Sequence, residues 1–503
     1  MQTKNNHSSL TFKYLKEDLP AGLVVFLVAL PLCLGIALAS GAPLFSGIIT
    51  GIVGGIIVAL ASGSSLSVSG PAAGLTVIVL NGITELGNYN VFLLAVVIAG
   101  IFQIILGYLK AGIIGYYFPS SVIKGMLAAI GIILILKQAP VAIGYVKNNP
   151  IPYHLLSIII AVISIAIIVL WDTPALKKYI VFKWVPGALV AVIVGTLINE
   201  TIYMYDPALQ LTGNQLVQLP VSASIGDFFN QFTLPDFTAI TDPKVFILAI
   251  TIAIIASLES LLSTEAADKL DPQKRVTPTN RELKAQGIGN VIAGLIGGLP
   301  LTAVIVRTSA NVNAGGKTKL SAIFHGILLL ISAIALGSIL NKIPLACLAA
   351  VLLVVGYKLA KISLFKRMYQ LGWEQFLPFI ITILAIQFSD LLKGIAIGML
   401  VAIFYILRTN YRRDYIIHHD KKTEGGSISI HLTEHVTFLN KGSLAKKLSE
   451  IENNQHVIID ATNAHYIDLD ILEIIHDFAA TATNKNITVA LISVPAFKGI
   501  AGH

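Results

Sequence analysis

The chain has 503 residues, of which 55% are apolar and only 12% are charged, and its mean hydropathy is +0.79. Soluble globular domains carry about a quarter charged residues, so this composition excludes an ordinary soluble enzyme. The formal charge of +8 could indicate nucleic acid as a partner, but the basic residues lie mostly in short loops between apolar runs, where they report membrane topology. We therefore expect a lipid bilayer and no nucleic acid as partner.

Residues 1–18 are polar and lack the apolar stretch of a signal peptide, so we expect a cytoplasmic N-terminal segment. Beyond it, apolar runs near the ~20 residues that cross a bilayer recur as far as Leu407. They predict an all-α polytopic membrane protein with a transmembrane domain over residues 19–413. Fourteen candidate spans begin near residues 21, 44, 70, 91, 119, 154, 185, 244, 284, 302, 319, 344, 374 and 394. In the alternative interpretation, the weak spans near 70 and 302 are re-entrant loops.

The distribution of basic residues predicts which loops face the cytoplasm. With a cytoplasmic N-terminus, the inside loops contain the clusters at 269–284, 358–367 and 408–413, whereas residues 200–242 contain no Lys or Arg. Cytoplasmic loops carry the excess of Lys and Arg. We therefore expect a multi-pass protein of the cell inner (plasma) membrane with cytoplasmic N- and C-termini.

The fourteen spans divide into seven plus seven, and the third span of each half is interrupted in the same way. The first half reads Ser-Gly-Pro-Ala-Ala-Gly over residues 69–74, and the second reads Gly-Gly-Leu-Pro-Leu-Thr-Ala over residues 297–303. Paired short spans interrupted by Gly and Pro are typical of inverted-repeat transporters with a binding site at the membrane midplane. Two unrelated flexible connections would be the alternative explanation.

A helix that begins inside the membrane has backbone N–H groups without intrahelical partners and about half a positive charge at its start. Ser69 and Thr302 are expected to be the N-cap residues of the two short helices. If the repeats face each other, both helix starts converge and form an anion site. The expected substrate-binding residues are Ser69, Gly70, Ala72, Ala73, Gly74, Thr302, Ala303, Val304 and Arg307, with the amide of Ile305 as a further donor.

Two ionisable residues inside spans carry the chemistry that we expect. Arg307 lies four residues after Ala303 and could add a full positive charge to the anion site, or else form a structural ion pair with Glu259. Glu259 and Ser263 share one helix face and could hold a sodium ion or a proton as the coupling ion, or the carboxylate could simply neutralise Arg307. His325, alone in an apolar span, is expected to be a satisfied core histidine rather than a proton relay.

Several motifs occur in an order that resembles the SulP/SLC26 family of sulfate permease-like inorganic anion transporters. They read Asp-Leu-Pro-Ala-Gly-Leu at 18–23, Val-Ser-Gly-Pro at 68–71, Phe-Pro-Ser-Ser-Val-Ile-Lys-Gly at 118–125, Asn-Arg-Glu-Leu-Lys-Ala-Gln-Gly at 280–287 and Gly-Leu-Pro at 298–300. The resemblance implies a seven-plus-seven inverted repeat with core and gate domains, substrate between the third and tenth helices, and an elevator-like movement. It also implies that Glu259 is the coupling position, that the protein is a homodimer, and that a cytoplasmic STAS domain follows. Many members carry a glutamine after the first-helix proline, whereas Pro31 is followed here by Leu32 and Cys33.

After Arg413 the composition returns to that of a soluble domain. Strand and helix patterns alternate over residues 427–432, 441–451, 457–460, 469–481 and 487–494, which predicts a small α/β domain. This tail resembles a STAS domain, shortened at its end, over residues 427–503, with residues 414–426 as a linker. The turn that carries a phosphorylatable serine in some relatives reads Ile-Asp-Leu-Asp at 467–470 and has no serine, so phosphorylation there is not supported.

The sequence predicts a secondary active transporter of a small inorganic oxyanion, bicarbonate or sulfate, with no catalytic residues and no cofactor apart from Na⁺ or H⁺ as coupling ion. No phosphate-binding Gly-x-x-x-x-Gly-Lys loop is present that would indicate an ATP-driven pump. The run at 29–37 resembles a bacterial subgroup related to carbonic-anhydrase partners, which favours bicarbonate. An anion channel or exchanger of the same family and a nucleobase-type permease remain alternatives, and a membrane-anchored sensor is disfavoured by the tail.

Overall fold

A computed structural model describes residues 12–145, 153–179, 182, 185–206, 209–220, 225–389, 391–412, 415–420 and 427–497. The chain divides into two compact units, one made of residues 1–370 and 379–396 and the other of residues 371–378 and 397–503. Each unit is described by itself.

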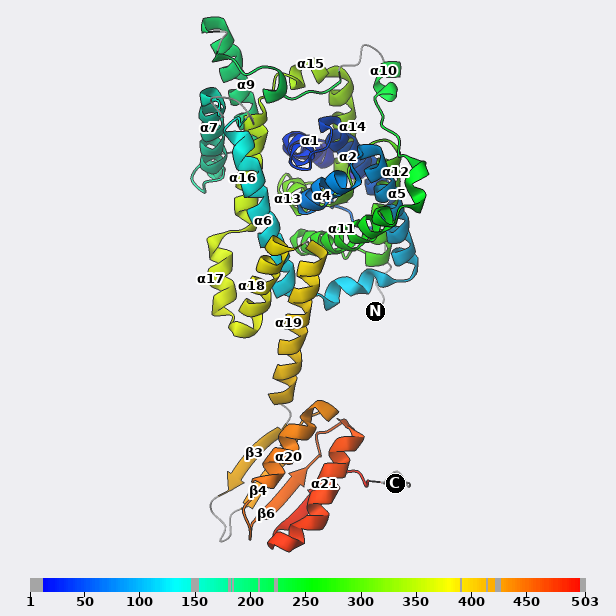
Figure 1. Ribbon diagram of the computed structural model, residues 1–503, viewed down its shortest axis with the longest axis vertical. Helices are drawn as coiled ribbons and strands as arrows, with labels where there is room; N and C mark the ends of the chain where they lie inside the picture. Colours follow the sequence, from blue (N-terminus) through cyan, green and yellow to red (C-terminus); the bar gives the residue numbers. More distant parts are fainter. Residues whose placement is uncertain are drawn as a thin grey trace. The chain divides into compact units, whose positions relative to one another are not determined.

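The first half of the membrane domain is a series of helices with one break (Figure 1). The break is a short strand, β1 (Ser69–Pro71), which a 3₁₀ turn (Ala73–Leu75) joins to α4. The helices are α1 (Leu15–Ala39), α2 (Leu44–Val53) with a π-helical turn (Gly54–Val58) and α3 (Ala59–Ala61), α4 (Thr76–Leu86), α5 (Tyr89–Tyr108), α6 (Ser120–Ala142), α7 (Leu155–Trp171) and α9 (Gly187–Tyr205); 3₁₀ turns cover Phe12–Tyr14, Ala111–Tyr117 and Leu176–Lys178.

The second half repeats this order, including the break. Its strand, β2 (Leu301–Ala303), precedes the short helix α13 (Ile305–Asn313). The halves are joined through 3₁₀ turns (Gly213–Gln215 and Phe237–Thr241) and α10 (Ile225–Asn230). The other helices are α11 (Pro243–Leu270), α12 (Thr279–Leu295), α14 (Leu320–Ala335), α15 (Gly337–Leu340), α16 (Leu345–Leu359), α17 (Ile362–Gln370), α18 (Trp373–Phe388) and α19 (Leu391–Arg412).

These elements account for the fourteen predicted spans. Within the described residues, eight helices are long and apolar enough to cross a membrane, and α4, α7, α14 and α18 belong to shorter apolar helices. The remaining two spans are α12, which carries a row of polar side chains, and the segment of β2 and α13, which is strand and short helix together. The multi-span helical architecture predicted from the sequence is confirmed.

Helix packing follows an internal two-fold relation between the halves. α5 packs against α11, and the equivalent pair, α14 against α1, is also in contact. α6 and α16, which occupy equivalent places, pack against each other through Gly131 and Gly356: a Cβ on either glycine would lie 2.5 or 2.8 Å from the carbonyl oxygen of the other. In an inverted repeat, each contact between a helix of one half and a helix of the other recurs between their equivalents, as it does here. Small residues such as glycine let two such helices approach closely.

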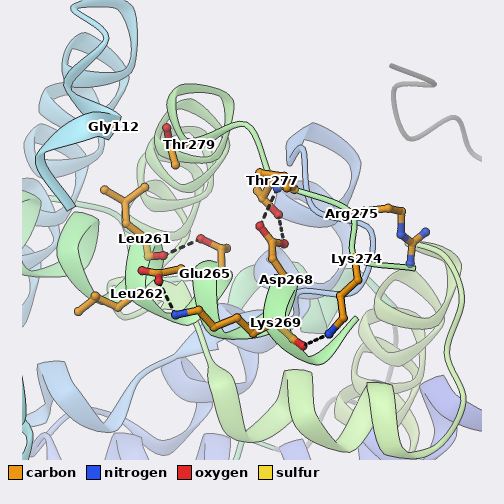
Figure 2. A pocket seen from close by; sticks show the side chains of 12 residues that line it. Gly112, Leu261, Leu262, Glu265, Asp268, Lys269, Lys274, Arg275, Thr277 and Thr279 are labelled. Atoms are coloured by element: carbon orange, nitrogen blue, oxygen red, sulfur yellow. Dashed lines mark hydrogen bonds and ion pairs between the residues drawn. The ribbon is translucent and has the colours of Figure 1, made fainter. Parts of the chain in front are cut away.

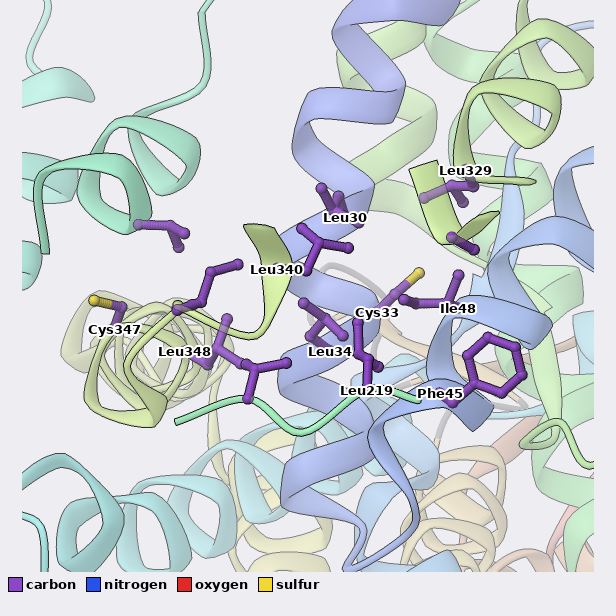
Figure 3. Close-up of a cluster of buried hydrophobic side chains, with 14 of the residues drawn as sticks. Leu30, Cys33, Leu34, Phe45, Ile48, Leu219, Leu329, Leu340, Cys347 and Leu348 are labelled. Atoms are coloured by element: carbon purple, nitrogen blue, oxygen red, sulfur yellow. The ribbon is translucent and has the colours of Figure 1, made fainter. Parts of the chain in front are cut away.

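The main apolar cluster of the membrane domain joins α1 and α2 to α14 and α16 (Figure 3). Cys33 and Leu34 of α1 are fully buried beside Ile48 of α2. Leu348 of α16 is fully buried in the same cluster. α1 thus packs against α13, the second half-helix, and also against α16.

The C-terminal unit contains a small α/β domain. Its four-stranded sheet has the order β3 (Tyr415–Asp420), β4 (Ser427–Leu432), β6 (His456–Asp460) and β8 (Thr488–Ile492), with β3 antiparallel to β4 and the others parallel. The helices are α20 (Lys441–Ser449) and α21 (Leu469–Ala482), β5 (His435–Val436) pairs with β7 (Tyr466–Ile467), and 3₁₀ turns cover Phe438–Asn440 and Thr483–Lys485. This arrangement fits a STAS domain.

The prediction of a linker over residues 414–426 is wrong for Tyr415–Asp420, which form β3. This segment begins with apolar residues but ends with two histidines and an aspartate, so its sequence lacks the alternating pattern that predicts a strand. Six residue pairs with β4, from Tyr415–Leu432 to Asp420–Ser427, hold it in the sheet. Cross-strand pairing, which sequence patterns do not show, decides its structure.

Candidate functional site

The two interrupted spans meet at a short antiparallel strand pair. Ser69 pairs with Ala303, Gly70 with Thr302 and Pro71 with Leu301. Each strand leads directly into its half-helix, and α4 and α13 both pack between α1 and α11 (Figure 1). The prediction that these two stretches converge is therefore confirmed.

The prediction that Ser69 and Thr302 cap the half-helices is wrong, because both residues are strand residues. The residues that precede the helical turns are Ala72 and Val304, and neither gives a side-chain cap. Ser69 Oγ instead accepts a hydrogen bond of 2.8 Å from Gln286 Nε2, and the Thr302 hydroxyl lies 3.2 Å from the carbonyl oxygen of Ala303. Strand pairing moves each helix start two to three residues further along the chain than capping preferences suggest.

Some of the backbone amides expected to bind the anion are already occupied. The Ala303 N–H donates to Ser260 Oγ at 3.2 Å, and the Val304 N–H donates to the carbonyl oxygen of Val68 at 2.9 Å. By contrast, the amides of Ala73 and Ile305, which begin the two helical turns, have no acceptor within the described part of the chain. At least one N–H on each side thus remains available, as helix starts require.

Arg307 is fully buried one turn after the strand pair. Its Nη2 donates to Cys33 Sγ at 3.3 Å, whereas Nε and Nη1 have no partner among the described residues. A Cβ at Gly70 would overlap Nη1, so the guanidinium lies directly against the β1 backbone. The glycine at position 70 is what makes room for it.

The alternative in which Arg307 forms an ion pair with Glu259 is not observed. No ion pair between them occurs among the described residues. A buried guanidinium without a carboxylate is costly, because desolvation is compensated only by a partner charge and hydrogen bonds. The site therefore has uncompensated positive charge and free donors next to two helix starts.

Glu259 lies on the other side of the site, half-buried on α11. Its carboxylate faces the backbone of Gly74, where a Cβ would lie 2.5 Å from Oε2 and 2.7 Å from Oε1, and Oε2 has no partner within the described residues. Ser263, one turn further along α11, is 8% exposed. A carboxylate with a hydroxyl on the same helix face supplies oxygen ligands of the kind that hard cations prefer. These residues therefore fit a sodium ion or a proton.

A row of polar side chains on α12 supports the strand pair, and the sequence prediction missed its role. Glu282, Gln286 and Asn290 follow at intervals of four and are all fully buried. Glu282 accepts from Ser62 Oγ and from Gln286 Nε2, which also donates to Ser69. Polar residues spaced by four in an otherwise apolar span were the available signal, because they share one helix face.

Asn290, the last residue of this row, binds the backbone of β2 directly. It accepts from the Leu301 N–H at 2.7 Å and donates to the Leu301 carbonyl oxygen at 3.2 Å and to Gln103 Oε1 at 2.6 Å. Gln103 in turn donates to Ser257 of α11 at 3.2 Å. α12 thus ties the strands to α5 and α11, which positions the half-helices.

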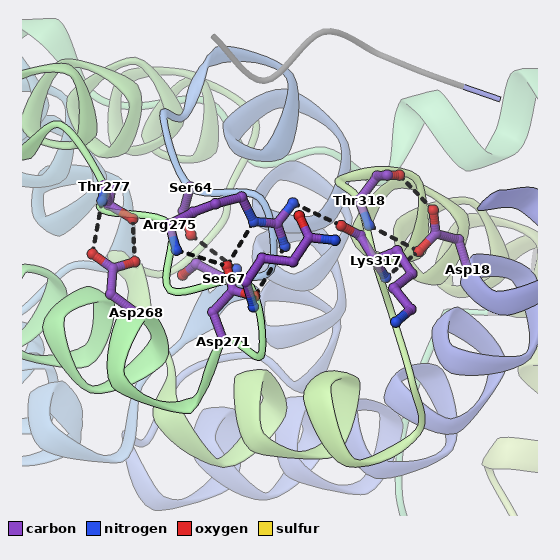
Figure 4. Close-up of polar contacts among 10 residues, drawn as sticks. Asp18, Ser64, Ser67, Asp268, Asp271, Arg275, Thr277, Lys317 and Thr318 are labelled. Atoms are coloured by element: carbon purple, nitrogen blue, oxygen red, sulfur yellow. Dashed lines mark hydrogen bonds and ion pairs between the residues drawn. The ribbon is translucent and has the colours of Figure 1, made fainter. Parts of the chain in front are cut away.

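A second polar network closes one end of the membrane domain (Figure 4). The carboxylate of buried Asp18 accepts hydrogen bonds from the backbone amides of Lys317 and Thr318. The Arg275 guanidinium donates to the Asp271 carboxylate and to the Lys317 carbonyl oxygen. Burial acts to raise the pKa of Asp271, but the hydrogen bonds and charge of Arg275 outweigh it, and the pKa lies below its ordinary value. The loops after α11 and α13 are therefore anchored to the start of α1.

Two cavities approach these elements. One, of about 490 Å³, lies at the end of α11 among charged side chains such as Lys269 and Lys274, and it contains none of the predicted site residues (Figure 2). The other, of about 510 Å³, reaches the first turns of α13 at Val306 and Ala310 and is bounded by α1 and α16. The second cavity borders α13 through Val306 and Ala310, and neither Ile305 nor Arg307 is among its lining residues.

The comparisons with known proteins agree with this architecture. The model of the Sulfate permease family matches residues 15–383. The chain belongs to this family. Its members are membrane transporters.

The relatives and solved structures that this chain resembles include sulfate and bicarbonate transporters. It is 28% identical to YvdB of Bacillus subtilis, a candidate sulfate transporter, over 90% of this chain and 86% of the relative. It is 29% identical to the bicarbonate transporter BicA of Picosynechococcus sp., over 78% of this chain and 70% of that protein. The transmembrane domain of a cyanobacterial BicA matches with a TM-score of 0.65 at 25% identity, covering 78% of this chain and 98% of that domain.

A murine anion transporter, Slc26a9, in the inward-facing state supports the fold over both units. It matches with a TM-score of 0.77 at 18% identity and covers 97% of this chain and 87% of that protein. The inverted-repeat fold predicted from the sequence is thereby confirmed.

Proposed function

We propose that this protein is a secondary active transporter of a small inorganic oxyanion, sulfate or bicarbonate. The observation that carries the proposal is the buried Arg307 guanidinium, which has two donor nitrogens without a partner and no ion pair to a carboxylate among the residues that the structure describes. A group of this kind is tolerated where an anion regularly supplies the missing charge and acceptors.

In this proposal the anion binds beside the strand pair. The amides of Ala73 and Ile305 donate from the two helix starts, and the aligned peptide dipoles add positive potential. Ala72, Gly74, Ala303 and Val304 contribute small or apolar surroundings that let the ion approach the backbone, and Ser69, Gly70 and Thr302 form the strands on which it lies. Apolar side chains at the helix starts support a compact inorganic ion rather than a nucleobase, which needs polar side chains around its ring.

Coupling is assigned to Glu259 and Ser263, which hold Na⁺ or H⁺ while the anion is bound. The unpartnered Oε2 of Glu259 supports this role, because a buried carboxylate oxygen without a donor is stabilised by a cation. Transport then proceeds by an elevator-like movement of the core domain that contains α4 and α13.

The protein is proposed to reside in the cell inner (plasma) membrane as a homodimer with both termini in the cytoplasm. The orientation rests on the excess of Lys and Arg in alternate loops and their absence from residues 200–242. The shortened STAS-like tail, over residues 427–503, then lies on the cytoplasmic side.

Uptake into proteoliposomes tests the proposal. Wild-type protein should accumulate labelled sulfate or bicarbonate, each measured with and without an inward sodium or proton gradient. Arg307→Ala should abolish uptake, whereas Arg307→Lys, which retains the charge without the planar fork, should retain part of it. Unchanged uptake by Arg307→Ala would refute the proposed site, and large currents that need no gradient would assign a channel instead.

A further inference from the structure

His325 of α14 is a buried imidazole that the proposed mechanism does not use. Its side chain is fully buried, its Nδ1 lies 3.3 Å from the Ala322 carbonyl oxygen, and its Nε2 has no partner among the described residues. A carbonyl oxygen can only accept, so Nδ1 carries the hydrogen and Nε2 carries the lone pair. The sequence prediction that His325 is a core histidine with its hydrogen bonds satisfied is therefore wrong, because Nε2 has no partner among the described residues.

Two glycines, Gly51 of α2 and Gly55 of the π-helical turn that continues it, place this ring close to the anion site. A Cβ on Gly55 would lie 2.8 Å from His325 Nδ1, while a Cβ on Gly51 would lie 4.0 Å from Arg307 Nη1 and 2.7 Å from Cys33 Sγ. Residues four apart on a helix lie close together, about 5–6 Å from each other. The ring and the guanidinium thus contact backbone positions about one helical turn apart.

Arg307 is the charged group that faces His325. α14 packs against α1, α2, the π-helical turn, α3 and α15. Residues 44–61 and 337–340 contain no ionisable side chain. α1 contributes the Cys33 thiol and, at its start, Lys16, Glu17 and Asp18, of which Asp18 accepts hydrogen bonds from Thr318 just before α14 begins. Lys319 just before α14 donates to the Ser62 carbonyl oxygen instead. A proton on His325 is therefore opposed mainly by the charge of Arg307.

We propose that His325 is the proton site that accompanies a divalent oxyanion. The inference rests on the proposed function and deepens it. A monovalent anion neutralises Arg307 and leaves no net charge to attract a proton. Sulfate brings one further negative charge into the same buried site, and a proton on Nε2 cancels it. The two anions then differ by one proton at His325, which sulfate recruits and a monovalent anion does not.

Proton uptake on anion binding tests this inference. Purified full-length protein in a weakly buffered detergent solution with a pH indicator receives either sodium sulfate or sodium nitrate, a monovalent oxyanion that does not itself titrate near neutral pH. We expect proton uptake to be about one greater per bound sulfate than per bound nitrate. His325→Gln and His325→Asn should lose the sulfate-linked uptake, while the matched control His154→Gln should keep it.

A second measurement needs no variant. When sulfate binding takes up one proton more than nitrate binding, the ratio of sulfate to nitrate affinity changes by up to tenfold per pH unit where His325 is unprotonated. Equal pH dependence for both anions would overturn the inference, as would sulfate-linked uptake that persists in both His325 variants or disappears only in Glu259→Gln. Failure of the proposed function would look different, because wild-type protein would then show no saturable binding of either anion.

Discussion

Replacement of Arg307 by methionine should move stability and anion binding in opposite directions. In the protein without anion, Nε and Nη1 are buried donors without acceptors, and each such group costs about 1–3 kcal/mol. The substitution removes these costs and forfeits the single hydrogen bond to Cys33. Methionine fills a similar volume, so little cavity remains. We expect a gain in unfolding free energy of about 1–4 kcal/mol, as for other buried charges replaced by apolar residues.

Anion binding should respond with the opposite sign. Removal of one partner from a buried, hydrogen-bonded charge pair costs about 2–5 kcal/mol, which corresponds to about a 30- to 4,000-fold weaker sulfate affinity. Sulfate at about 100 times its Kd stabilises wild-type protein by about 2.7 kcal/mol. That ligand-dependent stabilisation should vanish in Arg307→Met at the same concentration.

Thermal unfolding in detergent, with and without sulfate, measures both effects in one assay, and sodium gluconate at matched ionic strength is the control for salt. Arg307→Lys keeps the charge and should remain as unstable as wild type without sulfate. A methionine variant that is less stable than wild type without anion would refute the reasoning, because it would mean that the guanidinium has a permanent partner.

Three further variants examine other parts of the site. Glu259→Gln should leave sulfate binding detectable but stop gradient-driven accumulation in proteoliposomes, and normal accumulation would remove this carboxylate from coupling. Gly70→Ala introduces a methyl group that overlaps the Arg307 guanidinium; we expect at least about tenfold weaker sulfate binding by titration, and unchanged affinity would show that the guanidinium reorients freely. Arg275→Gln removes the hydrogen bonds that hold the pKa of Asp271 below its ordinary value; this carboxylate stabilises the fold above its unfolded pKa, so the loss of thermal stability should be full at pH 7 and shrink toward about pH 3. A deficit that stayed constant with pH would contradict this assignment.

The sequence predicted where the half-helices lie but not how they begin. Gly and Pro at equivalent places in the two halves were sufficient to identify the interrupted spans. The strand pairing of Gly70 with Thr302 depends on residues more than two hundred positions apart. Capping preferences are local and favoured Ser69 and Thr302 as helix starts, whereas the pairing makes them strand residues.

The role of Arg307 also required coordinates. In sequence, an ion pair with Glu259 and a free guanidinium were both consistent with one arginine and one carboxylate in neighbouring spans. The structure separates the two groups, with the arginine against Gly70 and the carboxylate against Gly74. The row of Glu282, Gln286 and Asn290 was visible as a spacing of four in the sequence, but its target, the strand backbone, was not.

The separation of the two charges has a consequence for coupling in the proposed mechanism. Arg307 and Glu259 flank the strand pair from opposite sides, and each has polar atoms without a partner. In the proposed mechanism the negative charge of an anion at the helix starts makes a cation at Glu259 more favourable, and the reverse holds to the same extent. If the two groups formed an ion pair instead, the first ion to bind would have to break that pair, and cooperativity would depend on its opening. Charges held apart on one packed unit therefore provide cooperativity between anion and coupling ion without any conformational change at the site.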